Sequence, residues 1–248
     1  MINVTAQATP MSAYNNRGGE INNETLGMTA EKVICDICCI DSSLIAHRSN
    51  PGYEVVLRPY VERSLIDLPP ILKHVGTERG DRGGQSKSAV DFICKDGKTL
   101  SVKTTKGSWK LCPSECGQPG AETFDRYFGH LYEGQINPLK FKQLVLEKID
   151  QMIPIYLKHT FDCDFMLYLY TGKKSGHFIF RKSEIPSLIW DIERFSFTKN
   201  IVTWNESCTV KYDGISIGEF QVHKHRSPYK FRFEIRNLHG LIEAKREL

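Results

Sequence analysis

The chain has 248 residues, of which 40% are hydrophobic and 25% charged, and its formal net charge is +4. These are ordinary values for a globular protein. The sequence contains no run of about 18 apolar residues and no basic start followed by an apolar stretch, which argues against a transmembrane helix and a secretory signal peptide. We therefore expect a cytoplasmic protein with no membrane partner, whose mild positive charge permits a polyanionic partner without requiring one.

The eight cysteines need not form disulfides in a reducing compartment. Cys35, Cys38 and Cys39 lie in an apolar run and are expected to be buried helix residues. Cys112 and Cys116 enclose Pro-Ser-Glu and could supply half of a zinc site, but no second pair stands at a usual spacing. Metal-free cysteines are the preferred interpretation, and zinc at this pair is left open.

The expected order of helices and strands indicates an α/β or α+β domain around a mixed sheet flanked by helices. Apolar spacing and turn residues predict the elements in chain order. The first part has a flexible lead-in over 1–24, a helix from about Glu24 or Thr29 to Ala46, a short strand over 54–57, a turn or short helix over 65–74, a loop over 77–88, and strands over 89–94 and 99–104. The second part has an irregular region over 107–135, a helix over 139–158, a hairpin with strands over 165–171 and 177–181, a short helix over 183–195 and mostly strand over 196–235. We expect a single domain over residues 25–248.

The most informative segment runs from Ser88 to Lys106 and is expected to form a hairpin. A two-residue turn at Asp96-Gly97 would set apolar side chains against polar ones. A three-residue loop ending in a left-handed Gly97 brings nearly all apolar side chains to one face, and register follows the hydrophobic pattern. The favoured register pairs Val90 with Val102, Phe92 with Leu100, and Cys94 with Lys98.

In that register Asp91, Ser101 and Lys103 share the opposite face of the hairpin, with Asp91 across from Ser101 and diagonal to Lys103. A carboxylate can hold a hard cation such as Mg²⁺, which polarises a phosphoryl group, while a lysine orients the attacking water and offsets developing charge. Such a pair suits phosphodiester hydrolysis. The alternative is an exposed ion pair on a sheet face, which contributes under about 1 kcal/mol to stability.

Asp91, followed after nine residues by Ser101-Val102-Lys103, resembles the PD-(D/E)XK motif of restriction endonuclease-like nucleases. The preceding helix with Glu31, the basic Gly-rich stretch before the motif and the hairpin near the C-terminus also look like parts of type II restriction enzymes, over about residues 24–240. The resemblance implies a restriction endonuclease-like core and Mg²⁺-dependent double-strand cleavage of DNA at a short sequence. It also implies a homodimer that matches a symmetric site, and a companion DNA methyltransferase not held in a stable complex.

Two positions depart from the family pattern. Val90 stands where the family has proline, and Ser101 stands where it has a second acid. Another element would then supply that acid, and the candidates are Glu31, Glu115 and Glu122. Glu31 is preferred because the first helix commonly packs beside the active-site edge in this fold; the alternative is that Glu31 only stabilises the helix dipole. The resemblance thus implies catalytic roles for Asp91, Lys103, Glu31 and Ser101, with Asp91 and Glu31 binding the metal.

Two basic stretches are candidate DNA-contacting surfaces. The 77–88 loop carries Arg79, Arg82 and Lys87 among glycines, so that backbone amides and guanidinium groups can approach phosphates, and Lys106 lies just past Lys103. Alternating apolar residues near the C-terminus predict a half-buried ribbon that fits the major groove, and its polar face and turn carry Gln221, His223, His225, Arg226, Lys230 and Arg232. Either stretch could instead be an ordinary solvated surface.

The preferred function is a type II restriction endonuclease with a catalytic core over about 25–160 and a β-rich DNA-recognition part over about 160–248. A structure-selective repair or recombination nuclease and a non-catalytic DNA-binding module remain alternatives, because a fold can persist without its activity.

Overall fold

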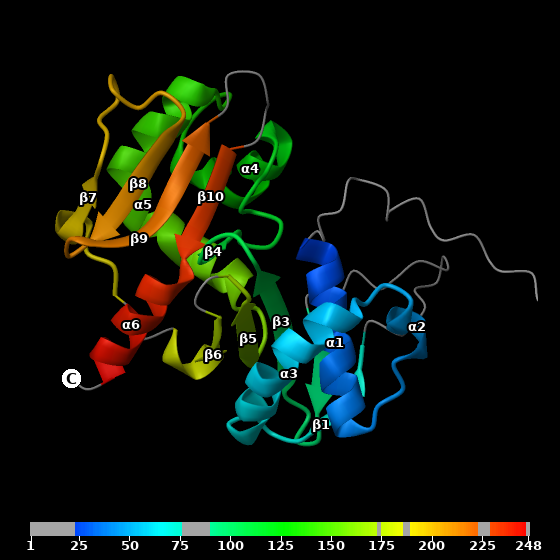
Figure 1. Ribbon diagram of the computed structural model, residues 1–248. Helices are drawn as coiled ribbons and strands as arrows, with labels where there is room; N and C mark the ends of the chain where they lie inside the picture. Colours follow the sequence, from blue (N-terminus) through cyan, green and yellow to red (C-terminus); the bar gives the residue numbers. More distant parts are fainter. Residues whose placement is uncertain (1–22, 76–89, 173–174, 186–188, 223–228, 247–248) are drawn as a thin grey trace, which may run out of the picture.

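The strands of the described residues form two five-stranded sheets (Figure 1). The computed structural model describes residues 23–75, 90–172, 175–185, 189–222 and 229–246. The helices are α1 (Asn23–Cys38), α2 (Ser43–Ala46), α3 (Pro51–Ile66), α4 (Ala121–Phe128), α5 (Pro138–Thr160) and α6 (Ile235–Arg246), with 3₁₀ turns η2 (Gly129–Leu131), η3 (Lys182–Glu184) and η4 (Ile192–Arg194). The strands are β1 (Ile71–His74), β2 (Phe92–Cys94), β3 (Thr99–Thr105), β4 (Lys110–Leu111), β5 (Phe165–Tyr170), β6 (Gly176–Arg181), β7 (Phe195–Phe197), β8 (Ser207–Tyr212), β9 (Ile215–Val222) and β10 (Tyr229–Glu234).

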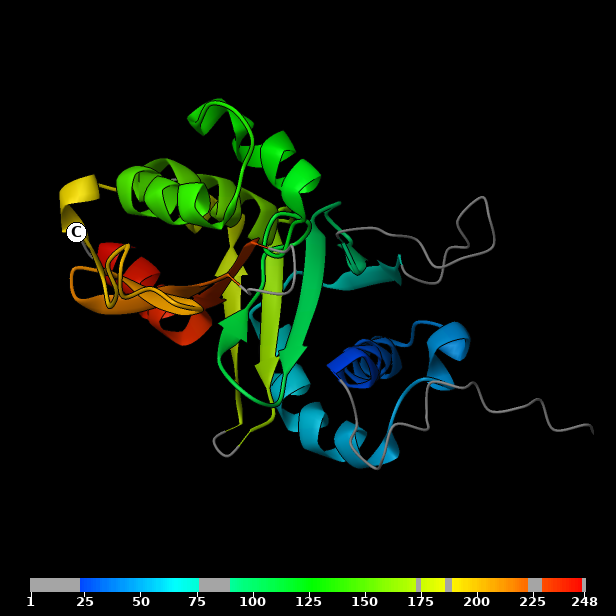
Figure 2. The same cartoon turned by 90° about the horizontal axis from the view of Figure 1, so that it is seen from above.

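The first sheet has the strand order β1-β2-β3-β5-β6 and is mixed, because β3 and β5 are parallel and the other neighbours are antiparallel. Alternate residues of β3 and β5, among them Leu100, Val102 and Leu167, pack against apolar residues of α1 and α3. Figure 2 shows α1 and α3 on one side of this sheet and α5 on the other. The expected mixed sheet flanked by helices is confirmed.

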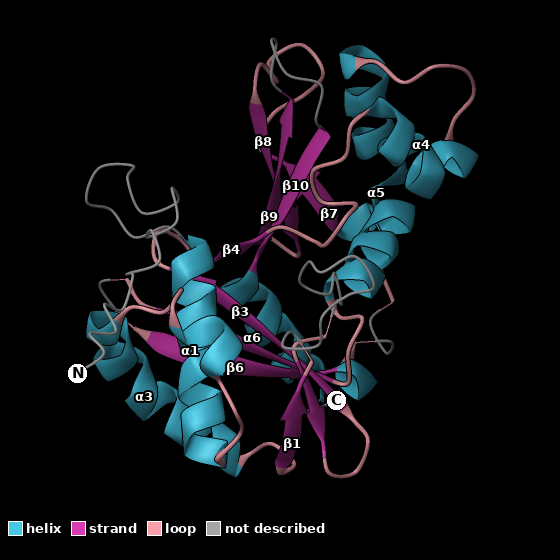
Figure 3. Ribbon diagram, turned by 90° about the vertical axis from the view of Figure 1, so that its right-hand side faces the viewer, coloured by secondary structure: helices cyan, strands magenta, loops and turns pink. Residues whose placement is uncertain are grey.

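The second sheet has the order β4-β10-β9-β8-β7 and is antiparallel throughout. Its inner face is aromatic: Phe220 and Phe231 pack against Tyr156 of α5, which runs beside this sheet in Figure 3. The same apolar cluster includes Tyr168 and Phe180 of the first sheet. One hydrophobic core therefore joins both sheets through α5.

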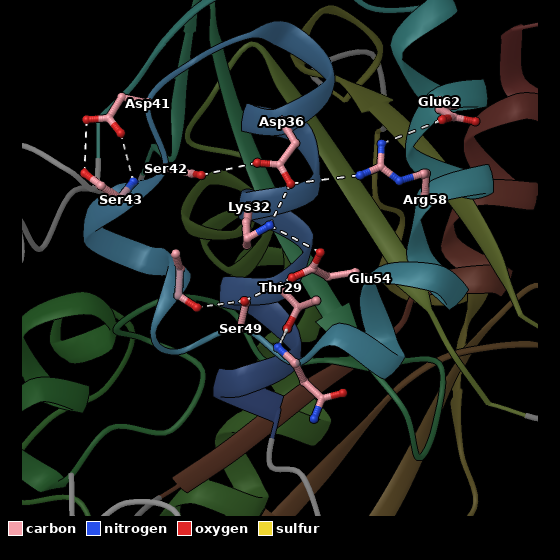
Figure 4. Close-up of polar contacts among 12 residues, drawn as sticks. Thr29, Lys32, Asp36, Asp41, Ser42, Ser43, Ser49, Glu54, Arg58 and Glu62 are labelled. Atoms are coloured by element: carbon pink, nitrogen blue, oxygen red, sulfur yellow. Dashed lines mark hydrogen bonds and ion pairs between the residues drawn. The ribbon is translucent and has the colours of Figure 1, made fainter. Parts of the chain in front are cut away.

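A polar network fixes α1 against α3 (Figure 4). The ammonium of Lys32 lies 3.2 Å from the carboxylate of Glu54 on α3, and the backbone amide of Asn50 donates to the hydroxyl of Thr29 at 3.0 Å. Because Lys32 points toward α3, its neighbour Glu31 points toward the sheet, where it is buried. The network therefore sets the rotation of α1 about its axis.

The first helix ends earlier than its sequence suggests. Cys39 has a positive φ of 55°, which stops the helix at Cys38, and a separate short helix begins at Ser43. The expectation that three neighbouring cysteines are buried is correct for Cys35 and wrong for Cys39, which is exposed, while Cys38 is half-buried.

The strand expected over 54–57 is wrong, because this segment lies inside α3. The side chain of Asn50 accepts a hydrogen bond from the amide of Tyr53 and caps the helix, and Pro51 occupies its first position. The turn or short helix expected over 65–74 is also wrong in part, since its second half is strand β1. The expected loop over 77–88 and nearly all of the expected lead-in over 1–24 lie outside the described residues.

In the C-terminal half, the helix expected over 139–158, the hairpin of β5 and β6, and the run of strands are confirmed. The region 107–135 is not wholly irregular, because Phe124 and Phe128, one helical turn apart, are buried on α4. The helix expected over 183–195 is wrong: η3 and η4 occur there. The extended segment ends at Glu234, after which α6 buries Leu238, Leu241 and Ile242. No helix in the described part of the chain is long and apolar enough to span a membrane.

The parallel pairing of β3 with β5 is anchored by Asp164. Its carboxylate accepts hydrogen bonds from the amide of Thr99 at 2.9 Å and from the Thr99 hydroxyl at 2.8 Å. These bonds lower the pKa of Asp164 below its ordinary value. The stability that they contribute is therefore present above pH 3.8 and is lost as the pH falls through the lowered pKa.

We predict that Asp164→Ala lowers the free energy of unfolding at neutral pH by about 1–3 kcal/mol, because it leaves the Thr99 donors without their acceptor. Urea denaturation measures this deficit, which shrinks in acid. The control is Asp162→Ala, whose side chain is 64% exposed and pairs with Lys182 at 3.6 Å; it changes stability by less than about 0.5 kcal/mol. Equal losses for the two variants would contradict the prediction.

Candidate active site

The hairpin of β2 and β3 has the register expected from the sequence. Phe92 pairs with Leu100, and the amide of Cys94 donates to the carbonyl of Lys98 at 2.8 Å. Gly97 is left-handed, with φ of +80°. The three-residue loop is therefore confirmed.

β3 continues beyond the point where β2 begins, and Asp91 occupies the bend there. The amide of Asp91 donates to the carbonyl of Leu100 at 3.0 Å. Its carboxylate oxygen Oδ2 accepts hydrogen bonds from the Val102 amide at 2.6 Å and from the Ser101 hydroxyl at 3.0 Å. A side-chain oxygen thus takes the place of a strand carbonyl as the partner of β3.

The pairing of Val90 with Val102, expected from the sequence, is wrong for this reason. The ladder between the two strands ends at Phe92, and the Val102 amide donates to Asp91 instead. Val90 packs against the core cluster that contains α5, whereas Val102 packs against the one that contains α1.

Lys103 lies on the same side of the hairpin as Asp91. Its ammonium nitrogen is 3.9 Å from Asp91 Oδ2, and the side chains of Lys103 and Asp91 are 30% and 20% exposed. Both groups are therefore accessible to solvent and converge at one place. The three contacts of the Asp91 carboxylate involve Oδ2, so Oδ1 is without a hydrogen bond from any described residue.

Glu31 approaches this pair from α1. It is 7% exposed, and its Oε2 lies 2.8 Å from Nε2 of His74 on β1. Burial raises the pKa of Glu31, the hydrogen bond from His74 partly opposes this, the charge of Asp91 raises the pKa further, and Lys103 lowers it. Glu31, Asp91 and Lys103 therefore share one electrostatic environment. His74 was missed in the sequence because its strand was interpreted as a turn.

The other two candidate acids lie elsewhere. Glu115 has a positive φ of 56° and its carboxylate accepts a hydrogen bond from the hydroxyl of Tyr127. Glu122 is exposed in the first turn of α4. The charges of Asp91 and Lys103 both act on the pKa of Glu31, which supports Glu31 as the second acid.

Cys116 is buried and Cys112 is half-buried. Burial raises the pKa of Cys112 and takes that of Cys116 to about 12. Among the residues that the structure describes, no three His, Cys, Asp or Glu side chains gather as a ready-made metal site. Neither the cysteine pair nor Asp91 with Glu31 belongs to such a group of three described residues.

Gln221, Lys230 and Arg232 lie on the polar face of the second sheet, where Lys230 pairs with Gln221 and Arg232 with Glu219. Glu219 accepts hydrogen bonds from Arg232 at 3.0 Å, from Lys110 at 2.5 Å and from Gln221. Burial alone would raise the pKa of Glu219, but the two cations lower it. The expected alternation is thus confirmed for these residues, which are tied together by Glu219.

The remaining candidates for DNA contact are placed as follows. Lys106 is half-buried and directly follows β3. Six candidates lie outside the described residues: Arg79, Arg82, Lys87, His223, His225 and Arg226.

A comparison with curated proteins finds a relative that is 27% identical over 238 residues, or 92% of this chain: the type II restriction enzyme CviAII of Paramecium bursaria Chlorella virus 1. This chain is similar to a type II restriction enzyme. It spans 63% of the length of that relative. No family model matches the chain, and no solved structure matches it significantly.

The comparison confirms the resemblance to restriction endonucleases that the sequence indicated. The relative's name does not identify catalytic residues, so the assignment of Asp91, Ser101 and Lys103 to a PD-(D/E)XK motif stays a prediction.

We predict that Glu31→Gln raises the melting temperature of the metal-free protein at pH 7. Because folding raises the pKa of Glu31, the ionised carboxylate disfavours the folded state, and the wild type loses stability as the pH rises through the raised pKa. The amide keeps a hydrogen bond to His74 without the charge. The advantage disappears below the ordinary pKa of 4.5.

The test is to measure the melting temperatures of the wild type and Glu31→Gln in EDTA, from pH 7 to below the ordinary pKa of 4.5. The control is Glu62→Gln, on the exposed side of α3. A variant that melts below the wild type at pH 7 would show that the charge of Glu31 is compensated in the folded protein.

Proposed function

We propose that the chain is a Mg²⁺-dependent type II restriction endonuclease that makes double-strand cuts in DNA at a short specific sequence. The observation that carries the proposal is the convergence of Asp91 and Lys103 at the point where β2 and β3 diverge. The similarity to a type II restriction enzyme over 92% of the chain supports the same class of reaction.

The donor groups at this place fit Mg²⁺. The ion takes oxygen ligands, keeps several waters and is commonly bound through one or two carboxylates and the substrate's phosphates, so it needs no complete protein cage. Asp91 offers Oδ1, and Glu31 is the proposed second acid. The like charge of Asp91 raises the pKa of Glu31, a repulsion that a bound cation would relieve. When bound, the ion would polarise the phosphoryl group and neutralise charge on it.

The protein's own residues supply the remaining chemistry. The Val102 amide and the Ser101 hydroxyl orient the Asp91 carboxylate, so Ser101 acts on a ligand and need not itself be an acid. The ammonium of Lys103 lies 3.9 Å from the Asp91 carboxylate, close enough for the two charges to attract each other. Its N–H groups would orient the attacking water, and its charge would stabilise the negative charge that develops on the scissile phosphate.

We further propose that catalysis belongs to the first sheet and DNA recognition to the second. The proposed boundary between the catalytic core and the DNA-recognition part then lies after β6 rather than at about residue 160, because β5 pairs with β3 and β6 pairs with β5 in the first sheet. Gln221, Lys230 and Arg232 would face the DNA, with Lys106 near the cleaved strand. A homodimer and a companion DNA methyltransferase complete the proposal, since a two-fold assembly matches a symmetric site.

Asp91→Ala and Lys103→Ala are each predicted to reduce Mg²⁺-dependent cutting of plasmid and phage DNA by at least about 100-fold, the scale of a lost electrostatic catalytic group. The circular dichroism and the melting curve of Lys103→Ala stay close to those of the wild type. Asp91→Ala keeps the circular dichroism of the wild type but melts at a lower temperature, because the Val102 amide and the Ser101 hydroxyl lose their acceptor.

The matched controls are Asp96→Ala and Lys98→Ala. These residues form a second acid–lysine pair in the same hairpin, 3.5 Å apart and well exposed, and the variants keep full activity. Full activity of Asp91→Ala or Lys103→Ala would exclude this mechanism.

Lys230→Ala is predicted to weaken DNA binding to all sequences and to reduce the slope of log affinity against log salt by about one, because one phosphate contact is lost. Binding is measured by fluorescence anisotropy in Ca²⁺. The control is Lys158→Ala, an exposed residue of α5, which lies against the opposite face of the second sheet. An unchanged salt slope for Lys230→Ala would remove this residue from the DNA surface.

A further inference from the structure

The last residue of β1 and the residue that follows it contact the two acids of the candidate site. The imidazole of His74 lies 2.8 Å from the Glu31 carboxylate, and the amide of Val75 donates to the backbone carbonyl of Asp91 at 2.9 Å. Glu31 comes from α1 and Asp91 from the bend before β2. The end of β1 therefore connects two acids that are 60 residues apart in the sequence.

The contact between His74 and Glu31 is sheltered from water. The His74 side chain is fully buried and that of Glu31 is 9% exposed. The imidazole ring packs against Phe92 of β2, with 4.8 Å between ring centroids, and so has little freedom to turn. A buried carboxylate without a hydrogen-bond donor is costly, and here the donor is a rigid ring on a strand rather than a flexible chain.

We propose that His74 is a positioning residue of the active site: its Nε2 holds the Glu31 carboxylate in the orientation that binds the divalent cation beside Asp91. The proposal rests on the proposed function, in which Glu31 is the second metal-binding acid. It adds a residue that the motif does not contain. Residues that hold a metal ligand in place typically change metal affinity or activity by about 10- to 100-fold when they are replaced.

The position of Glu31 makes such a support necessary. The rotation of α1 directs the residue toward the sheet, as the contact of Lys32 with Glu54 shows, but a glutamate has three rotatable side-chain bonds and is not oriented by its backbone alone. The hydrogen bond from β1 fixes its outer end. Because Val75, directly after β1, holds the backbone of Asp91, the separation of the two carboxylates depends on the end of this strand.

The test is a titration of the full metal-free chain with Mn²⁺, in which free Mn²⁺ is followed by electron paramagnetic resonance. His74→Leu should weaken Mn²⁺ binding by about 10- to 100-fold. His74→Gln, which returns an amide donor of similar reach, should restore most of the affinity. The control is His177→Ala on β6, a half-buried histidine outside the site, and this variant binds Mn²⁺ as the wild type does.

A second comparison guards against poor folding of His74→Leu, which leaves the Glu31 carboxylate buried without its partner. In a Glu31→Gln background that charge is absent, and adding His74→Leu should cause no further loss of Mn²⁺ affinity, because His74 acts through Glu31. A further loss in this background, or no loss from His74→Leu in the wild-type background, would overturn the proposal.

Failure of the proposed function and failure of the role of His74 give different experimental results. If the wild type neither binds Mn²⁺ nor cuts DNA, the proposed function fails and this inference falls with it. If the wild type binds Mn²⁺ and cuts DNA while His74→Leu binds equally well, only the role of His74 is excluded.

Discussion

At the start of β2, the backbone amide of Val102 donates its hydrogen bond to the carboxylate of Asp91. Two neighbouring strands diverge here, and an amide of β3 needs an acceptor that the partner strand does not provide. The side-chain oxygen satisfies it and is thereby fixed in the plane of the sheet. The consequence is a carboxylate whose Oδ2 is held by β3 and lies 3.9 Å from the Lys103 ammonium, while Oδ1 accepts no hydrogen bond from any described residue. The rest of the proposed chemistry depends on this one arrangement.

The remaining parts of the fold bring other groups to this place. The mixed sheet is completed by the parallel pairing of β3 with β5, which Asp164 anchors at one end. Helix α1 is rotated by its polar network with α3, so that Glu31 faces the sheet. The end of β1 then contacts both acids. Together these contacts determine where the functional side chains lie.

Much of the candidate site was predictable from the sequence, because a hairpin encodes its own register. The Gly97 turn and the apolar pattern of Phe92 and Leu100 determine which side chains share a face, and these are local features. The bend at Asp91 was not predictable in this way. It depends on where pairing stops, which is a property of both strands and of their neighbours.

The errors elsewhere have similar causes. The interpretation of 54–57 as a strand gave too little weight to Asn50 and Pro51, which begin α3. The termination of α1 depends on the left-handed Cys39, a conformation for which a cysteine gives no sequence signal. His74 could not be recognised, because its importance arises from a contact with a residue 43 positions earlier.

The most direct test of the proposed activity is to incubate the purified wild-type chain with unmethylated phage DNA, with and without Mg²⁺, and to sequence the ends of the products. A Mg²⁺-dependent, sequence-specific endonuclease gives discrete fragments only when Mg²⁺ is present, and all of their ends map to one short sequence. Ends at unrelated sequences or at branched structures, or no Mg²⁺-dependent product, would contradict the proposed activity.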